Sequence, residues 1–378
     1  MLQNRVNKIY YSHILWVLFA LIYLIYQIFE TGLISPKLKE ILHGAEIISG
    51  GGLPYIDFKT MISPGIFYIN SLFYDNILFI KLISGLNIIL ISACIYYLSR
   101  KVINKEYAIY PSILSIILIS VANPWGTAWL FALLFILISA IFIFKYLENN
   151  TEIKYVFYSG LMLGLASLFR HEMAGFIFGA IFQAVFFMSL SHRKADLMQK
   201  NEKMVYGLKN ALVLALGLTP VLPFTIYLLI KIPIKTLWNQ LFISPFTVFR
   251  TDGNIPFPNL FNFDVFNIFD LWFGIIFYST LIMIIFLVYY LVKNVKSKII
   301  KLNGTKFWQL LMIFNVCLNL FNIPMIASDY WHFLPILICG NIILFIYISE
   351  INNKLVNKIM KTITLTFILS VILLPINN

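Results

Sequence analysis

Long apolar stretches follow one another along almost the whole chain and are separated by short polar segments. A stretch of about 17–25 apolar residues is long enough to cross the hydrocarbon core of a bilayer as a helix. About eleven such stretches can be marked, at approximately 10–29, 78–99, 107–122, 126–145, 154–169, 173–190, 208–230, 270–292, 307–323, 332–349 and 358–375. The pattern therefore predicts one all-α integral membrane domain over residues 1–378, with about 11 transmembrane helices.

The first polar segment, 30–76, has a pattern of its own. Ser35 and Pro36 provide an N-cap and a first-turn proline. Apolar residues then recur at the spacing of one helix face: Leu38, Ile41, Leu42, Ala45 and Ile48. We expect an amphipathic helix here, lying against the membrane surface. A second surface helix is predicted over 64–76, because Asp75 and Asn76 interrupt any attempt to cross the membrane there.

The segment 231–269 is rich in aromatic residues and prolines. It is too apolar for a free linker and too short for a catalytic domain. We interpret it as an aromatic loop or lid lying on the membrane and guiding an isoprenoid chain. Simple anchoring at the membrane interface is the alternative interpretation.

Composition and charge exclude a conventional soluble enzyme and indicate how the chain is oriented. Hydrophobic residues make up 60% of the chain, charged residues only 12%, and the mean hydropathy is +0.87. A net charge of +12 would suggest nucleic acid in a soluble protein. Here, however, most of the 28 Lys and Arg gather in alternate loops, as expected for the cytoplasmic side. The sequence thus predicts a multi-pass cell-membrane protein, with a cytoplasmic N-terminus, an outside C-terminus and no nucleic-acid partner.

Ionisable residues break the apolar pattern at two later places, both on the predicted outer side. Arg170, His171 and Glu172 follow a span of only about 15 residues, or ~22 Å of helix, so they are expected below the outer surface, facing a cavity. Asp329 and His332 stand three residues apart at the head of a helix and share one face. The alternatives are a hairpin turn with a snorkelling ion pair at the first place, and a capping Asp beside an interfacial aromatic belt at the second.

Two acids of the first outer segment are further candidates. Asp57 stands two residues before Lys59 in a loop bounded by glycine and proline. Glu30 closes the first span. Asp57 could instead be a solvated loop acid, and Glu30 an ordinary residue at the membrane interface.

These residues resemble the motifs of a known family. Pro54-Tyr55-x-Asp57-Phe58 follows a small-residue turn, Ser63-Pro64-Gly65 opens an aromatic surface helix, and Ser99-Arg100-Lys101 ends the next span. Arg170-x-Glu172 and Asp329-x-x-His332 follow in the same order and on the same side. The chain is similar to the GT-C class of membrane glycosyltransferases, which includes the protein mannosyltransferase and aminoarabinose transferase superfamily and uses polyprenyl-phosphate sugars as donors.

The resemblance implies roles for the candidate residues. Asp57, or else Glu30, would be the catalytic base that takes the acceptor's proton. The substrate-binding set would comprise Tyr55, Lys59, Arg170, His171, Glu172, Asp329 and His332, with Arg170, His332 and Lys59 on the phosphate and Glu172 and Asp329 orienting them. One position departs from the pattern. Many relatives have an acid near position 35, where this chain has Ser35, and Glu30 and Glu40 are the nearest substitutes.

The same resemblance implies the partners. They are a polyprenyl-phosphate sugar donor, a glycan, lipid or protein acceptor of the cell envelope, and membrane lipids. No cofactor is identified. A divalent metal is left open, because Asp, Glu and His occur on the outer side but at no spacing of a known ligand motif.

Two other functions are compatible with the sequence. A transporter or flippase of lipid-linked sugars would place its polar groups near the bilayer midplane, whereas here they gather at the outer ends of spans. A polysaccharide polymerase or ligase usually relies on arginines in a large outer loop, and Arg250 is the only Arg within 231–269.

Overall fold

The computed structural model describes most of the helical body of the chain. The described residues are 14, 16–18, 20–25, 36–103, 107–121, 126–149, 152–190, 200–245, 247, 285, 288–289, 292–297, 304–320 and 330–350. Within these ranges the chain is helical and forms no β-strand, only one isolated bridge between Pro54 and Phe58.

Among the residues that the structure describes, four helical stretches are long and apolar enough to cross a membrane. They are Ile77–Val102, Ala128–Glu148, His171–Leu190 and Met204–Lys231. The first three correspond to helices α4 (Ile77–Val102), α6 (Ala128–Asn149) and α8 (His171–Leu190). The fourth corresponds to two helices, α10 (Lys200–Leu216) and α11 (Leu222–Lys231), with a short 3₁₀ turn, η1 (Thr219–Val221), between them. The expectation of an all-α membrane protein is confirmed to this extent.

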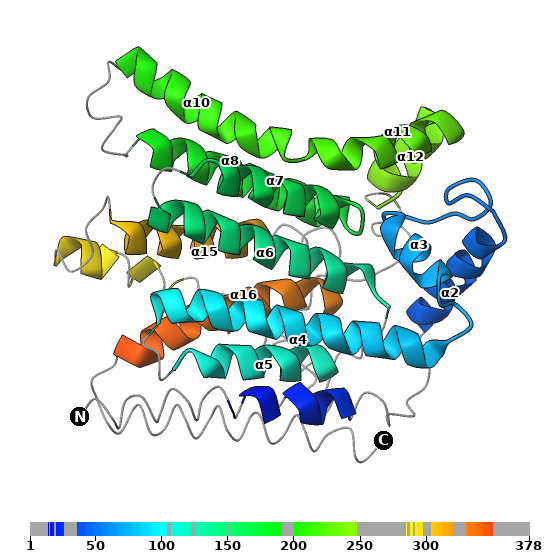
Figure 1. Cartoon of the computed structure of the whole chain (residues 1–378), viewed down its shortest axis with the longest axis horizontal. Coiled ribbons are helices and arrows are strands. Elements are labelled where there is room, and N and C mark those ends of the chain that lie inside the picture. The colour runs from blue at the N-terminus through cyan, green and yellow to red at the C-terminus, as the bar shows by residue number, and fades with distance from the viewer. Residues whose placement is uncertain are drawn as a thin grey trace.

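Within the described ranges the bundle also contains α5 (Ile109–Val121), α7 (Lys154–Ser167), α15 (Thr305–Leu320) and α16 (Tyr330–Glu350). Figure 1 shows them side by side with the longer helices, in roughly parallel rows. The α6 window is the most buried of the four candidate spans, at 72%, whereas the α10–α11 window is only 22% buried. Helix α6 is therefore the centre of the bundle, and α10–α11 forms its edge.

Helix α7 comes very close to the α10–η1 stretch. A Cβ atom at Gly160 would collide with the backbone carbonyl of Leu214, and one at Gly217 with the carbonyl of Phe157. Only glycine permits this approach of two backbones. The two positions thus fix how the edge helices lie against the bundle.

A set of short elements gathers at one end of the bundle, the end at which α4 begins and α7 ends (Figure 1). We call it the site end. It contains α2 (Pro36–Ser49), α3 (Gly65–Ser71), α12 (Ile234–Trp238) and a π-helical turn, η2 (Asn239–Ile243). Helices α2 and α3 pack against each other. The ring of Phe67 in α3 meets that of Phe58, in the loop between the two helices, edge to face with centroids 5.0 Å apart.

Several predicted boundaries differ from those observed. The second helix of segment 30–76 is shorter than predicted, because Asn76 caps α4 by accepting the amide of Phe79 and so begins a new helix. The span expected over 208–230 divides at η1, next to Pro220 and Pro223, which cannot donate backbone hydrogen bonds. Half of 10–29, most of 270–292 and all of 358–375 lie outside the described residues. The count of eleven spans and the placement of α2 and α3 at a membrane surface stay predictions.

Candidate functional site

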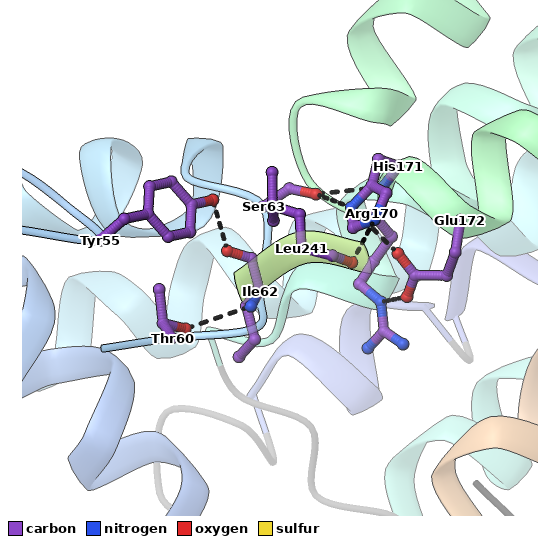
Figure 2. Close-up of polar contacts among 8 residues, drawn as sticks. All are labelled: Tyr55, Thr60, Ile62, Ser63, Arg170, His171, Glu172 and Leu241. Atoms are coloured by element: carbon purple, nitrogen blue, oxygen red, sulfur yellow. Dashed lines mark hydrogen bonds and ion pairs between the residues drawn. The ribbon is translucent and has the colours of Figure 1, made fainter. Parts of the chain in front are cut away.

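Three segments that are far apart in the sequence meet at the site end. They are the loop 50–64 between α2 and α3, the junction 168–172 between α7 and α8, and the stretch 234–243 that contains α12 and η2. Figure 2 shows their polar contacts. A backbone hydrogen bond connects the end of the first segment to the second. The amide of Gly65, which begins α3 directly after the loop, donates to the carbonyl of Leu168 at 2.8 Å.

An ion pair stands at the junction. The Nε–H of Arg170 donates to Oε1 of Glu172, and the two side chains are only 13% and 23% exposed. The pair arises because α7 ends at Ser167 and α8 begins at His171, which places Glu172 in the first turn of α8. A carboxylate in a first turn interacts favourably with the helix dipole. Both charges are thus largely buried within the protein, and their position below the outer membrane surface stays a prediction.

The ring of His171 is held on both sides. Its Nε2 lies 3.1 Å from the carbonyl oxygen of Leu241, and its Nδ1 lies 2.9 Å from Oγ of Ser63. Because a carbonyl oxygen only accepts, Nε2 is the nitrogen that donates to Leu241, which leaves Nδ1 to pair with the Ser63 hydroxyl. The same Ser63 oxygen accepts the backbone amide of His171 at 3.1 Å. The carboxylate of Glu172 lies 3.4 Å from Nδ1, so it borders both the guanidinium and the imidazole.

Tyr55 adopts an unusual backbone conformation. Its φ of 68° lies in the left-handed region, which for a residue with a bulky side chain costs on the order of 1–3 kcal/mol. The surroundings hold it there. The side chain is 3% exposed, packs with Leu228 and Leu237, and donates its hydroxyl to the carbonyl of Ile62 at 2.9 Å. The loop 50–64 is therefore folded back on itself around a buried tyrosine.

The hydroxyl of Tyr55 is kept neutral. Burial raises its pKa far above the ordinary value, and the nearby Glu172 carboxylate and the Tyr68 hydroxyl add to the effect. Tyr55 therefore acts as a hydrogen-bond donor at physiological pH and not as a base.

A single side chain from η2 binds the same loop at two points. The amide oxygen of Gln240 accepts the backbone N–H of Thr60 at 3.0 Å, and its amide nitrogen donates to the carbonyl of Tyr55 at 2.8 Å. Thr60 in turn accepts the amide of Ile62 through its hydroxyl at 3.1 Å. These bonds connect positions 180 and 185 residues apart in the sequence.

Asp57 and Lys59 lie on the exposed side of the loop. One oxygen of Asp57 accepts the amide of Leu53 at 2.6 Å, and the Asp57 amide donates to the Leu53 carbonyl at 3.0 Å. Asp57 thus closes a tight turn just after the glycines, and its carboxylate is accessible to solvent.

The structure brings together part of the predicted site. Tyr55, Arg170, His171 and Glu172 form one cluster, with Asp57 and Lys59 on the outward side of the same loop. Glu30 and Asp329 lie outside the described residues. His332 stands in the first turn of α16, and its side chain is outside them as well. In the described part of the chain, no three His, Cys, Asp or Glu side chains are grouped so as to hold a metal ion.

Two contributors were not singled out as site residues from the sequence. Ser63 was noted only as the start of a helix. Gln240 is one of two neighbouring amides in an aromatic stretch, and the sequence gave no signal of its contacts.

Residues 64–227 match the family of dolichyl-phosphate-mannose-protein mannosyltransferases. The match extends from the start of α3 to within α11 and includes the Arg170-His171-Glu172 junction. No curated protein and no solved structure gave a match to this chain. The matched stretch is less than half of the chain, and its similarity to a mannosyltransferase family agrees with the resemblance of the sequence to GT-C glycosyltransferases.

Proposed function

We propose that the protein transfers a sugar from a polyprenyl-phosphate donor to a glycan, lipid or protein acceptor at the outer face of the cell membrane. The observation that carries this proposal is the largely buried Arg170–Glu172 pair, which lies within the family match and at the end of an apolar bundle. A lipid phosphate would suit this combination, since its negative charge would pair with Arg170 and the long apolar chain beside it would lie against the apolar bundle.

Arg170 is the proposed contact for the phosphate that leaves. A guanidinium presents five N–H donors in one plane, and a bond through Nε to Glu172 fixes the direction of that plane. In Figure 2 the two terminal nitrogens of Arg170 extend away from His171. Positive charge held in this way stabilises the negative charge that develops on the leaving phosphate.

Asp57 is the proposed base. Its carboxylate would take the proton of the acceptor hydroxyl while that oxygen attacks the anomeric carbon. The bond between this carbon and the phosphate oxygen breaks, and polyprenyl phosphate leaves with the electron pair. Lys59, on the same loop, would add positive charge near the phosphate. Glu30 is the alternative base, and Asp329 and His332 would complete the donor site.

Tyr55 and His171 have positioning roles in this proposal, because their polar atoms bind other parts of the protein. Tyr55 donates to Ile62, and the two ring nitrogens of His171 bind Ser63 and Leu241. They support the loop and the junction that carry Asp57 and Arg170.

The experiment is a transfer assay with the purified protein in lipid vesicles. Polyprenyl-phosphate hexoses serve as donors and cell-envelope glycans, lipids and proteins as acceptors, with and without a chelator, which decides whether a divalent metal takes part. We expect covalent transfer, and a loss of at least about 100-fold in Asp57→Ala. Asp75→Ala, which changes another exposed acid between α3 and α4, is the matched control. Full activity of Asp57→Ala would contradict its assignment as the base.

A further inference from the structure

We infer that Gln240 is the positioning residue that sets the reactive conformation of the loop 53–63. The inference rests on the proposed function of Asp57, which this loop carries. It concerns a residue outside the family match, in a stretch where the sequence alone indicated only a lid or a membrane anchor.

The two hydrogen bonds of Gln240 fix the orientation of its amide group. The backbone nitrogen of Thr60 can only donate, so the atom that faces it is the amide oxygen. The carbonyl of Tyr55 can only accept, so the atom that faces it is the amide nitrogen. Among the natural side chains of this length, only glutamine provides both an acceptor and a donor at neutral pH. The oxygen and the nitrogen of the amide thus both bind one loop.

The loop depends on such an anchor. It has no helix or ladder of its own between Leu53 and Pro64, and Ile56, Asp57 and Lys59 are exposed. Its bend requires Tyr55 in the left-handed region, a conformation that persists only where the surroundings enforce it. Gln240 binds the carbonyl of Tyr55 itself and the amide five residues later. Its two bonds therefore span the turn on which Asp57 lies.

The anchor also connects the loop to the Arg170 junction. Leu241, the next residue along η2, accepts the Nε2–H of His171, and His171 binds Ser63 at the end of the loop. The hydrogen bonds thus form a closed circuit from Gln240 through the loop to Ser63, His171 and Leu241. Since Gln240 and Leu241 belong to one π-helical turn, any shift of this turn moves the loop and the junction together.

The circuit predicts which kinetic constant Gln240 controls. Arg170, the main proposed contact for the phosphate, is held by its own ion pair with Glu172, and Ser63 binds His171 directly. Most of the donor binding therefore persists without Gln240, and only the contribution of Lys59, which lies on the same loop, is affected. The position of Asp57 relative to the acceptor, by contrast, is lost when Gln240 no longer holds the loop. Gln240→Met, which keeps the length and removes both bonds, is expected to lower kcat by between about 10-fold and 100-fold. The KM for the donor is expected to stay within about twofold.

A second variant gives a signature that a merely structural role would not produce. Glutamate at this position keeps the acceptor for Thr60 but, when ionised, cannot donate to Tyr55. When protonated it regains a donor, and the usual pKa of a glutamate is about 4.3. The kcat of Gln240→Glu, relative to the unchanged protein at each pH, should therefore rise as the pH falls from about 7 towards 5.

Hydrogen–deuterium exchange of the whole protein in vesicles measures the anchor without activity. The peptide that contains Thr60 should exchange at least about tenfold faster in Gln240→Met, because a hydrogen-bonded amide becomes exposed. Asn239→Ala, which changes the exposed neighbouring amide on the same turn, should exchange and turn over like the unchanged protein.

The outcomes separate this inference from the proposed function. Faster exchange with unchanged kcat, or unchanged exchange in Gln240→Met, would overturn the positioning role. Faster exchange in a protein that shows no transfer with any donor would leave the anchor intact and overturn the proposed function. If Gln240→Met does not fold, Gln240→Glu carries the kinetic test. Its kcat relative to the unchanged protein should be lowered at pH 7 and should recover as the pH falls, and a ratio that does not change with pH would overturn the positioning role.

Discussion

Oγ of Ser63 lies 2.9 Å from Nδ1 of His171, although the two residues are 108 positions apart in the sequence. The serine belongs to the loop that carries Asp57, and the histidine begins the helix that carries Glu172. This contact holds the two halves of the candidate site together. Nδ1 is the ring nitrogen left for this contact, because Nε2 donates to Leu241.

Replacement of Ser63 by alanine tests that contact. It leaves the His171 amide and Nδ1 without their partner in a site that is only 2% exposed at Ser63. We expect the free energy of unfolding to fall by about 1–3 kcal/mol, which is the usual cost of an unpaired buried polar group. Thermal unfolding in detergent measures it. Ser49→Ala, at the exposed end of α2, is the control, and equal melting temperatures for the two variants would contradict the account.

Gly65 is predicted to be intolerant of any side chain. A Cβ atom there would lie 2.6 Å from the carbonyl oxygen of Leu168, which already accepts the Gly65 amide. Gly65→Ala should therefore separate the loop from the junction, reduce stability by more than about 1 kcal/mol and lower transfer activity. Gly175→Ala serves as the matched variant, because nothing lies within 4 Å of its Cβ position and alanine favours a helix. Unchanged stability and activity in both variants would contradict the close approach of Gly65 to the Leu168 carbonyl.

The buried hydroxyl of Tyr55 predicts how stability depends on pH in the alkaline range. Its folded pKa is raised, above all by burial, whereas the unfolded chain ionises near the ordinary value of about 10. The folded state thus retains a proton that the unfolded state loses, so stability is intact below pH ~10 and falls above it, by at most about 1.4 kcal/mol per pH unit. Unfolding of the unchanged protein and Tyr55→Phe between pH 9 and 11 should show the steeper fall in the unchanged protein. Parallel curves would contradict a buried tyrosine here.

The guanidinium plane of Arg170 yields a kinetic prediction. Arg170→Lys keeps the positive charge but loses the planar donors, which bind Glu172 and, in the proposed function, a phosphate. We expect kcat/KM for the donor to fall by about 10-fold to 1000-fold, in steady-state assays of sugar transfer. Arg100→Lys is the comparison, since Arg100 lies at the opposite end of α4, where it stacks on Tyr96. Equal losses in both variants would indicate a general effect of arginine and not a phosphate site.

The sequence predicted the features that depend on local pattern. Helices α4 and α6 follow from long apolar runs, and the charged junction at Arg170 follows from three polar residues that interrupt such a run. The left-handed Tyr55 and the bonds of Gln240 could not be predicted, because they depend on how a loop folds against a segment about 180 residues away. The turn η2 has the composition of a membrane anchor, and only its tertiary contacts reveal its connection to the loop.

The balance of products tests the central claim of sugar transfer most directly. Vesicles that contain the protein, a polyprenyl-phosphate hexose and an acceptor would be sampled over time for glycosylated acceptor and for released polyprenyl phosphate. The proposed function predicts that the two appear in equal amounts, and that both are lost in Asp57→Ala and not in Asp75→Ala. Movement of the intact lipid-linked sugar across the vesicle membrane, with neither product formed, would contradict it and indicate a flippase.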